Sequence, residues 1–222
     1  MACPELSPGL PALVLSRTFC RIRRLGAAPE ANRYYAELVT AAEFTSTVAW
    51  GTVDPAAFDG LLLPGGHAPG MRQYLGSAVL RDQVARFWAV GRPVGAICHG
   101  VLVLARTRDP ATGHSVLAHR QTTCLPKYTE RLAYLAPAWR LGRYYRTYPA
   151  YVEDEVKAAL GDPASQFHRG PMVLTARGTA ANDTPAFPVS DRNYLSARWP
   201  GDAYLFGRRF CALLASAAQP GR

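Results

Sequence analysis

The stretch that most constrains the fold is RPVGAICHGVLVLA, at residues 92–105. Residues 94–97 form a short apolar run, which is typical of a strand buried on both faces of a sheet. Residues 100–105 are small or apolar and favour a helix packed on that strand. A strand that turns directly into a helix predicts an α/β domain built on a parallel sheet.

Cys98 lies at the junction between this strand and this helix. A residue on such a turn has its side chain pushed out of the sheet, and the first helical N–H groups point towards whatever it attacks. The helix dipole there favours thiolate over thiol, and Gly100 lets the turn close because it has no Cβ. The alternative is an inert buried cysteine, since a free cysteine packs like a small hydrophobe.

A second strand ends in a similar turn. Residues 60–63 are apolar, and the glycine-rich segment PGGHAPG follows them at 64–70. Because sites in parallel α/β sheets form at the carboxyl ends of strands, two such turns favour an active site around Cys98.

Composition and charge exclude several classes of protein. In a chain of 222 residues, 49% hydrophobic and 18% charged residues argue against disorder and fit one α/β domain. The net charge of +9 comes from scattered arginines with one cluster at 17–24, and no recognition motif accompanies them. We therefore expect neither a nucleic-acid nor a membrane partner. Five cysteines without CxxC spacing indicate a reducing cytoplasm.

Apolar periodicity and turn residues predict the remaining elements. The expected strands are 172–176, 187–189 and 194–197, with a short β excursion over 115–123. The expected helices are 29–42, 77–90, one beginning at 126, 152–160, and one opening at 200–202. We predict a doubly wound, mostly parallel sheet with helices on both faces. Neither GxGxxG nor GxxxxGK[ST] occurs, so no nucleotide cofactor is expected.

Three motifs together, LLLPGGHAPG, VGAICHG and NYLSARWPGDA, resemble the ThiJ/PfpI superfamily. Within it, the sequence is most similar to the branch of heat-shock chaperones and glyoxalase III proteins. The resemblance begins near residue 29 and implies a flavodoxin-like, class I glutamine-amidotransferase-like fold. It also implies a homodimer and a small carbonyl substrate handled without a cofactor.

The same resemblance implies the site residues. Cys98 would be the nucleophile and His99 its base, with Glu130 as the acidic residue that orients His99. The backbone of Gly65 and Gly66, with His67 beside them, would bind substrate and its oxyanion. Some relatives bind a metal through a histidine in this turn, but no partner ligands can be assigned in this sequence, so no metal is expected.

The first 28 residues depart from the family pattern. Relatives carry an acidic residue in a loop after their first strand, and it bonds the catalytic cysteine; nothing in 1–28 matches that segment. We interpret 1–28 as an atypical segment, truncated or substituted, before a domain at 29–222. Leu13–Leu15 could be a strand, and Glu5 or Glu30 could replace the missing acid.

Two functional hypotheses follow. The first is a cysteine-dependent enzyme on small reactive aldehydes, of the glyoxalase III type (methylglyoxal to lactate), or a related deglycase, peptidase or protein-repair activity. The second is a non-enzymatic holding chaperone or redox sensor with a degenerate site. The aromatic, arginine-rich segment 139–151 would be a lid over the site or a dimer contact, ahead of a nucleic-acid surface.

Overall fold

The computed structural model describes residues 29–66, 68, 70–142 and 149–218. The chain divides into two compact units, Met1–Val48 and Ala49–Arg222. In the first, the helix predicted over 29–42 is two helices, α2 (Pro29–Leu38) and α3 (Ala42–Thr45). The possible strand at 13–15 and the acidic Glu5 lie outside the described residues, and the prediction for 1–28 remains a prediction.

The second unit is built on a four-stranded sheet with the order β1-β2-β4-β3. Its elements, in chain order, are η1 (Trp50–Thr52), η2 (Pro55–Ala57), β1 (Leu61–Leu63), α4 (Met71–Gly76), α5 (Ala78–Val90), β2 (Val94–Ile97), η3 (Cys98–Gly100), α6 (Val101–Arg106), α7 (Lys127–Leu141), α8 (Val152–Ala158), α9 (Pro163–Gln166), β3 (Val189–Asp191), β4 (Tyr194–Ala197), η4 (Pro200–Asp202) and α10 (Ala203–Ala217).

The three strands β1, β2 and β4 run parallel, with Leu61 opposite Val94 and Val94 opposite Tyr194. Only β3 runs antiparallel, joined to β4 by a tight turn in which Arg192 has a positive φ of 57°. The prediction of a mostly parallel sheet is therefore confirmed.

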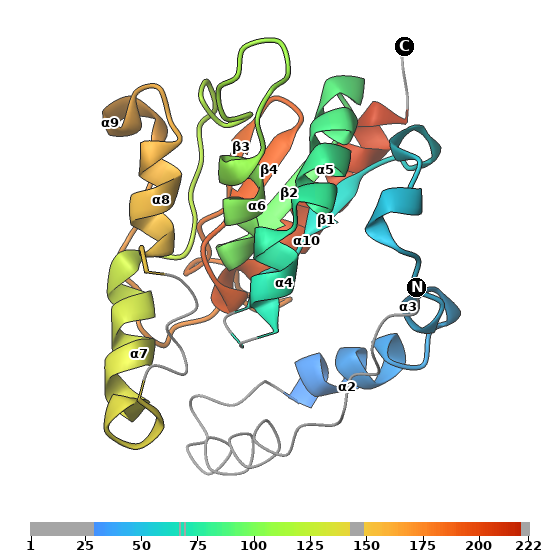
Figure 1. Ribbon diagram of the computed structural model, residues 1–222. Helices are drawn as coiled ribbons and strands as arrows, with labels where there is room; N and C mark the ends of the chain where they lie inside the picture. The colour runs from blue at the N-terminus through green and yellow to red at the C-terminus, as the bar shows by residue number, and fades with distance from the viewer. Residues whose placement is uncertain (1–28, 67, 69, 143–148, 219–222) are drawn as a thin grey trace. The chain divides into compact units, whose positions relative to one another are not determined.

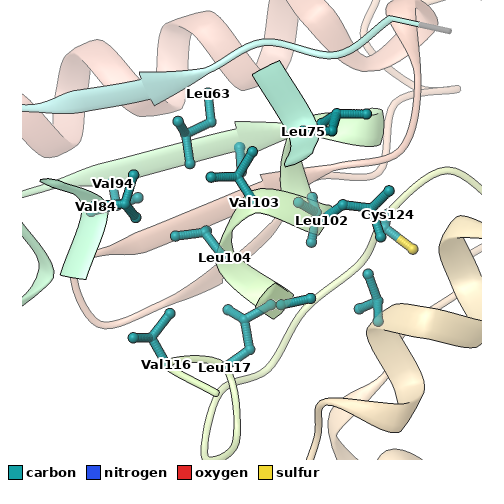
Figure 2. Packing of buried hydrophobic residues seen from close by; sticks show 14 of the residues in the cluster. Leu63, Leu75, Val84, Val94, Leu102, Val103, Leu104, Val116, Leu117 and Cys124 are labelled. Atoms are coloured by element: carbon teal, nitrogen blue, oxygen red, sulfur yellow. The ribbon is translucent and has the colours of Figure 1, made fainter. Parts of the chain in front are cut away.

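Helices cover both faces of this sheet (Figure 1). On one face, α4, α5 and α6 bury the larger apolar cluster, whose members Val84, Val94 and Leu104 are at most 1% exposed (Figure 2). On the other face α10 packs through Phe206 and Phe210. A Cβ on Gly95 would lie 2.9 Å from the Phe210 ring, so β2 needs glycine where this helix crosses it.

The residues predicted to start and end α5 do so in the structure. The Ser77 hydroxyl accepts a hydrogen bond from the Leu80 N–H at 3.1 Å, which caps the start of the helix. Gly91 ends the helix in the left-handed region, with φ 78°.

Two predictions of strands are wrong, and the strand predicted over 187–189 is displaced to β3, Val189–Asp191. Residues 172–176 are not a strand, since Met172 and Leu174 are exposed and the Tyr128 hydroxyl bonds both backbone groups of Val173. These contacts occupy the groups that a neighbouring strand would need. The expected excursion over 115–123 forms only isolated bridges, Arg108 with Ser115 and Thr122 with Phe167.

Candidate functional site

Cys98 lies where β2 ends, at the first residue of η3, which leads directly into α6. Its backbone φ is 81°, a value that residues other than glycine rarely adopt. Backbone strain of this kind persists where the surrounding structure holds it, and here it turns the side chain out of the sheet. The strand-turn-helix geometry predicted around Cys98 is therefore confirmed.

The turn after β1 packs directly against this elbow. A Cβ on Gly65 would lie 2.5 Å from the Cys98 Cβ, and one on Gly100 would lie 2.2 Å from the Leu63 carbonyl oxygen. Neither position has room for a larger residue. The two glycines thus allow the backbones that follow the adjacent strands β1 and β2 to approach each other closely.

A pocket of about 410 Å³ opens at this edge of the sheet. Its walls contain Gly65, Gly66, Cys98 and His99, so the structure brings together four of the predicted site residues. His67 lies outside the described residues, and its predicted role remains a prediction.

Among the residues that the structure describes, His99 is well placed to exchange a proton with the cysteine. Its Nδ1 lies 3.5 Å from the Cys98 Sγ, and the side chain is only 1% exposed. A base at this separation can take the thiol proton during attack on a substrate.

The thiol itself is not activated in the way the sequence suggested. Burial raises the pKa of Cys98 to about 12, because a thiolate is poorly solvated at 8% exposure. The backbone N–H of His99 lowers the pKa in part, while the charges of Glu130 and Asp202 raise it further. In this resting geometry, desolvation therefore outweighs the effect of the helix dipole, which the sequence predicted would favour the thiolate.

Glu130 is buried, at 4% exposure, and lies near enough to Cys98 for its negative charge to raise the pKa of the thiol. One of its carboxylate oxygens, Oε2, accepts a hydrogen bond from the Val152 N–H at 2.9 Å, at the first residue of α8. Glu153 of α8 in turn accepts from the Lys127 N–H at 2.9 Å, at the first residue of α7. Each carboxylate thus satisfies an unpaired N–H at the start of the other helix. Whether Glu130 also orients His99 remains a prediction.

Sequence reasoning missed four other residues that line the pocket, Leu125, Thr129, Trp199 and Pro200. Trp199 and Pro200 follow β4, which lies parallel to β2, so their turn reaches the same edge of the sheet. The position of WPGD directly after a buried strand was the signal that could have found them.

A buried ion pair holds the turn that follows β4. Arg198 Nη2 lies 2.9 Å from Asp202 Oδ1, and both side chains are at most 1% exposed. Arg198 also donates to the Pro171 and Pro185 carbonyls, and Asp202 accepts from the Phe187 N–H. The pair therefore fixes the backbone on either side of Trp199.

The other two cysteines in the described residues differ in their surroundings. Cys124 is fully buried, whereas Cys211 on α10 is exposed. In the part of the chain that the structure describes, no three His, Cys, Asp or Glu residues gather into a possible metal site. Within the same ranges, no helix has the length and apolar character needed to cross a membrane.

Comparison with known proteins identifies relatives that are similar to this chain in sequence and in fold. A protein named DJ-1 homolog D from Arabidopsis thaliana is 38% identical over 77 residues, which are 34% of this chain and 19% of that relative. A deglycase of Thermococcus kodakarensis is 28% identical over 167 residues, covering 75% of this chain and 69% of the relative.

The crystal structure of glyoxalase III from Candida albicans has the same fold, with a TM-score of 0.60 and 16% identity over 82% of this chain and 70% of that one. The class I glutamine-amidotransferase-like fold is thus confirmed. The sequence also matches the family described as ThiJ/PfpI family-like over residues 18–171, more than half of the 222. On this match, the chain belongs to the ThiJ/PfpI-like family.

Proposed function

We propose that the protein is a cysteine-dependent enzyme that converts small reactive aldehydes, of the methylglyoxal type, to hydroxy acids without a redox cofactor. The observation that carries the proposal is Cys98 on its strained turn, opening into a pocket with the His99 imidazole 3.5 Å from its sulfur. The names of the relatives, a deglycase and a glyoxalase III, support a carbonyl substrate.

The proposed reaction begins with a proton transfer. As Sγ of Cys98 attacks the aldehyde carbon, His99 Nδ1 takes the thiol proton, and the carbonyl oxygen gains the charge. The product is a thiohemiacetal with a negatively charged oxygen. Backbone N–H groups around Gly66 and His99 would stabilise this oxygen. The high pKa of Cys98 makes this transfer to His99 necessary, because little thiolate is present beforehand.

The second step is an internal oxidation and reduction. His99 first gives the thiol proton to the thiohemiacetal oxygen and is then free to act as a base. A base, His99 or a carboxylate, next moves a proton from the former aldehyde carbon to the neighbouring ketone carbon, while the hydroxyl proton of the first carbon passes to the ketone oxygen. The first carbon becomes a thioester and the second an alcohol, so the electrons stay within the substrate. Water then cleaves the thioester, which releases the hydroxy acid and restores the Cys98 thiol.

Burial of Cys98 also bears on the alternative functions. Oxidation to a sulfenic acid requires an accessible thiolate, so a buried thiol with a raised pKa argues against a redox sensor. A holding chaperone has one observation in its favour: Leu132, Leu135 and Trp139 are exposed at helical spacing on α7, by 53%, 54% and 84%. We keep it as the second candidate.

The first test is methylglyoxal consumption by the purified protein without glutathione, with lactate measured as product. We expect Cys98→Ser to abolish turnover and His99→Asn to reduce kcat by about a hundredfold or more, as for loss of a positioned base. Cys211→Ser is the matched control, since this exposed cysteine lies on α10, across the sheet from α6.

Deglycation would be followed in parallel, as release of free cysteine from its methylglyoxal adduct. Turnover that survives in Cys98→Ser would contradict the proposal. If the folded protein consumes no carbonyl but suppresses aggregation of a client, and Cys98→Ser does so equally, the chaperone hypothesis replaces it.

A further inference from the structure

The Cys98 pocket is larger and more apolar than a three-carbon aldehyde requires. An engineered cavity of about 150 Å³ takes up benzene, and methylglyoxal is smaller than benzene, so it fills roughly a third of the pocket of about 410 Å³. Among the described residues that line the pocket, none is an aspartate, glutamate, lysine or arginine, and Pro64, Ile97 and Leu125 are apolar. Walls of this kind bind the apolar body of a ligand, while a few polar groups orient it. The remaining space therefore fits an apolar substituent on the aldehyde.

Trp199 gives this pocket a large aromatic surface. It comes shortly after β4 and lines the pocket, and it also packs against the larger apolar cluster. Aromatic rings pair favourably with other rings, either offset-stacked or edge to face, and gain more than the buried area alone provides. A planar ring is therefore the substituent that matches this wall best.

The contacts around Trp199 hold its indole ring in place. A Cβ on Gly201 would lie 2.4 Å from Cζ2 of the ring, so only glycine lets the ring lie this close to the turn. The guanidinium of Arg177 lies over the ring, with 5.7 Å between its Cζ and the ring centroid, as in a cation–π contact. The ion pair of Arg198 with Asp202 fixes the backbone on either side. A wall that is already ordered loses little conformational freedom when a ligand binds.

We propose that Trp199 determines the specificity of the Cys98 site, and that its substrates are dicarbonyls R–CO–CHO in which R is an aromatic ring. This inference rests on the proposed function, because it names the substituent on the aldehyde that Cys98 attacks. The ring lies against the indole of Trp199, and the aldehyde carbon lies at the Cys98 sulfur. The bonds that form and break are those given above for methylglyoxal, so phenylglyoxal and water give mandelate.

The test compares phenylglyoxal with methylglyoxal in initial-rate assays of the full-length protein. Mandelate and lactate are measured as products, because phenylglyoxal also modifies arginine side chains. We expect kcat/KM to be about tenfold or more higher for phenylglyoxal, chiefly through a lower KM. Trp199→Leu should lower the ratio of the two kcat/KM values by about tenfold, and Trp199→Phe, which keeps a ring, should lower it less. Comparing this ratio between variants cancels the difference in reactivity between the two substrates.

Trp88→Leu is the matched control. Trp88 also packs against the larger apolar cluster and also lies under an arginine, with 4.8 Å between the Arg120 Cζ and the ring centroid. However, its ring contacts Tyr194, the first residue of β4, at the other end of that strand from Trp199. The control should leave the ratio unchanged. If Trp199→Leu, shown by circular dichroism to be folded, keeps the original ratio, or if Trp88→Leu lowers it equally, the proposal is overturned.

A binding measurement separates this proposal from the proposed function. Cys98→Ser is titrated with acetophenone, and with acetone as the probe without a ring, and the indole N–H signals are followed by ¹H–¹⁵N NMR. The signal of Trp199 is assigned by its absence from Trp199→Phe. We expect it to shift saturably with acetophenone, at an affinity about tenfold or more above that for acetone. If it does so in a protein without Cys98-dependent turnover, the proposed reaction fails while the aromatic binding site at Trp199 is confirmed. If Cys98 converts methylglyoxal but phenylglyoxal is not preferred and the signal does not shift, the proposed function stands and this proposal is overturned.

Discussion

The pH dependence of Cys98 alkylation tests the electrostatics of the site directly. With a pKa of about 12, roughly one Cys98 in 10⁵ is thiolate at pH 7, against about one in 100 at the ordinary value of 9.0. The difference is about a thousandfold in reactive species. Because the thiolate fraction grows tenfold per pH unit below the pKa, we expect the rate constant for iodoacetamide to rise tenfold per unit from pH 6 to 9 without levelling off.

Peptide mass spectrometry can follow Cys98 and the exposed Cys211 in the same sample. Poor access to Cys98 would lower its rate by the same factor at every pH, whereas a raised pKa moves the plateau, so the shape of the profile separates the two effects. A Cys98 rate that levels off below pH 8 would refute the reasoning. It would mean that the helix dipole and the His99 N–H outweigh burial, as the sequence suggested.

A second perturbation isolates the contribution of charge. Glu130 raises the pKa of Cys98 and accepts the Val152 N–H through one oxygen. Glu130→Gln keeps an acceptor for Val152 and removes the negative charge, so we expect faster Cys98 alkylation at a fixed pH. An unchanged rate in a folded variant would show that the charge of Glu130 does not reach the thiol.

Two further changes test the framework of the site. Burial alone would raise the pKa of Glu153, but hydrogen bonds from Arg169, Lys157 and the Lys127 N–H outweigh it. They lower the pKa from 4.5 to about 2, so the ionised carboxylate contributes about 3 kcal/mol to the free energy of unfolding above pH 4.5. That contribution is lost as the pH falls towards 2. In urea unfolding, we therefore expect Glu153→Gln to be less stable than the unmodified protein by about 3 kcal/mol at pH 7 and by about 1.4 kcal/mol at pH 3. A difference that does not change with pH would contradict this. Gly100→Ala should cost about 1–3 kcal/mol and impair turnover, because the new Cβ would lie 2.2 Å from the Leu63 oxygen, whereas Gly70→Ala, with open space around it, should change neither.

The parts of the fold that sequence predicted well are those with a local cause. The apolar run before Cys98, the Ser77 cap and the Gly91 stop each act within a few residues, and each is observed. Residues 172–176 mimic a strand locally, but distant contacts decide their structure: the Tyr128 hydroxyl bonds Val173, and Arg198 bonds the Pro171 carbonyl. No local pattern reveals such partners.

The candidate site divides in the same way. Cys98 and the glycine-rich turn at 64–70 were predicted to meet because a parallel sheet gathers the turns after neighbouring strands at one edge, whereas the roles of Gly65 and Gly66 came from the family resemblance. The pKa of Cys98 could not be predicted, because it depends on how deeply the turn is buried and on two charges, Glu130 and Asp202, that come from other parts of the chain. Sequence motifs indicated which residues meet, but not how well water reaches them.

A buried, uncharged thiol is compatible with catalysis if the site stabilises charge where the reaction creates it. The burial that disfavours a thiolate on Cys98 also lowers the local dielectric constant, and N–H groups aimed at a substrate oxygen act more strongly in such a medium. Proton transfer to His99 then leaves the negative charge on the substrate oxygen and not on sulfur. In the proposed reaction, the raised pKa would protect the resting thiol from oxidation and favour substrates whose oxygen can take the charge. A carbonyl next to a second carbonyl would be such a substrate.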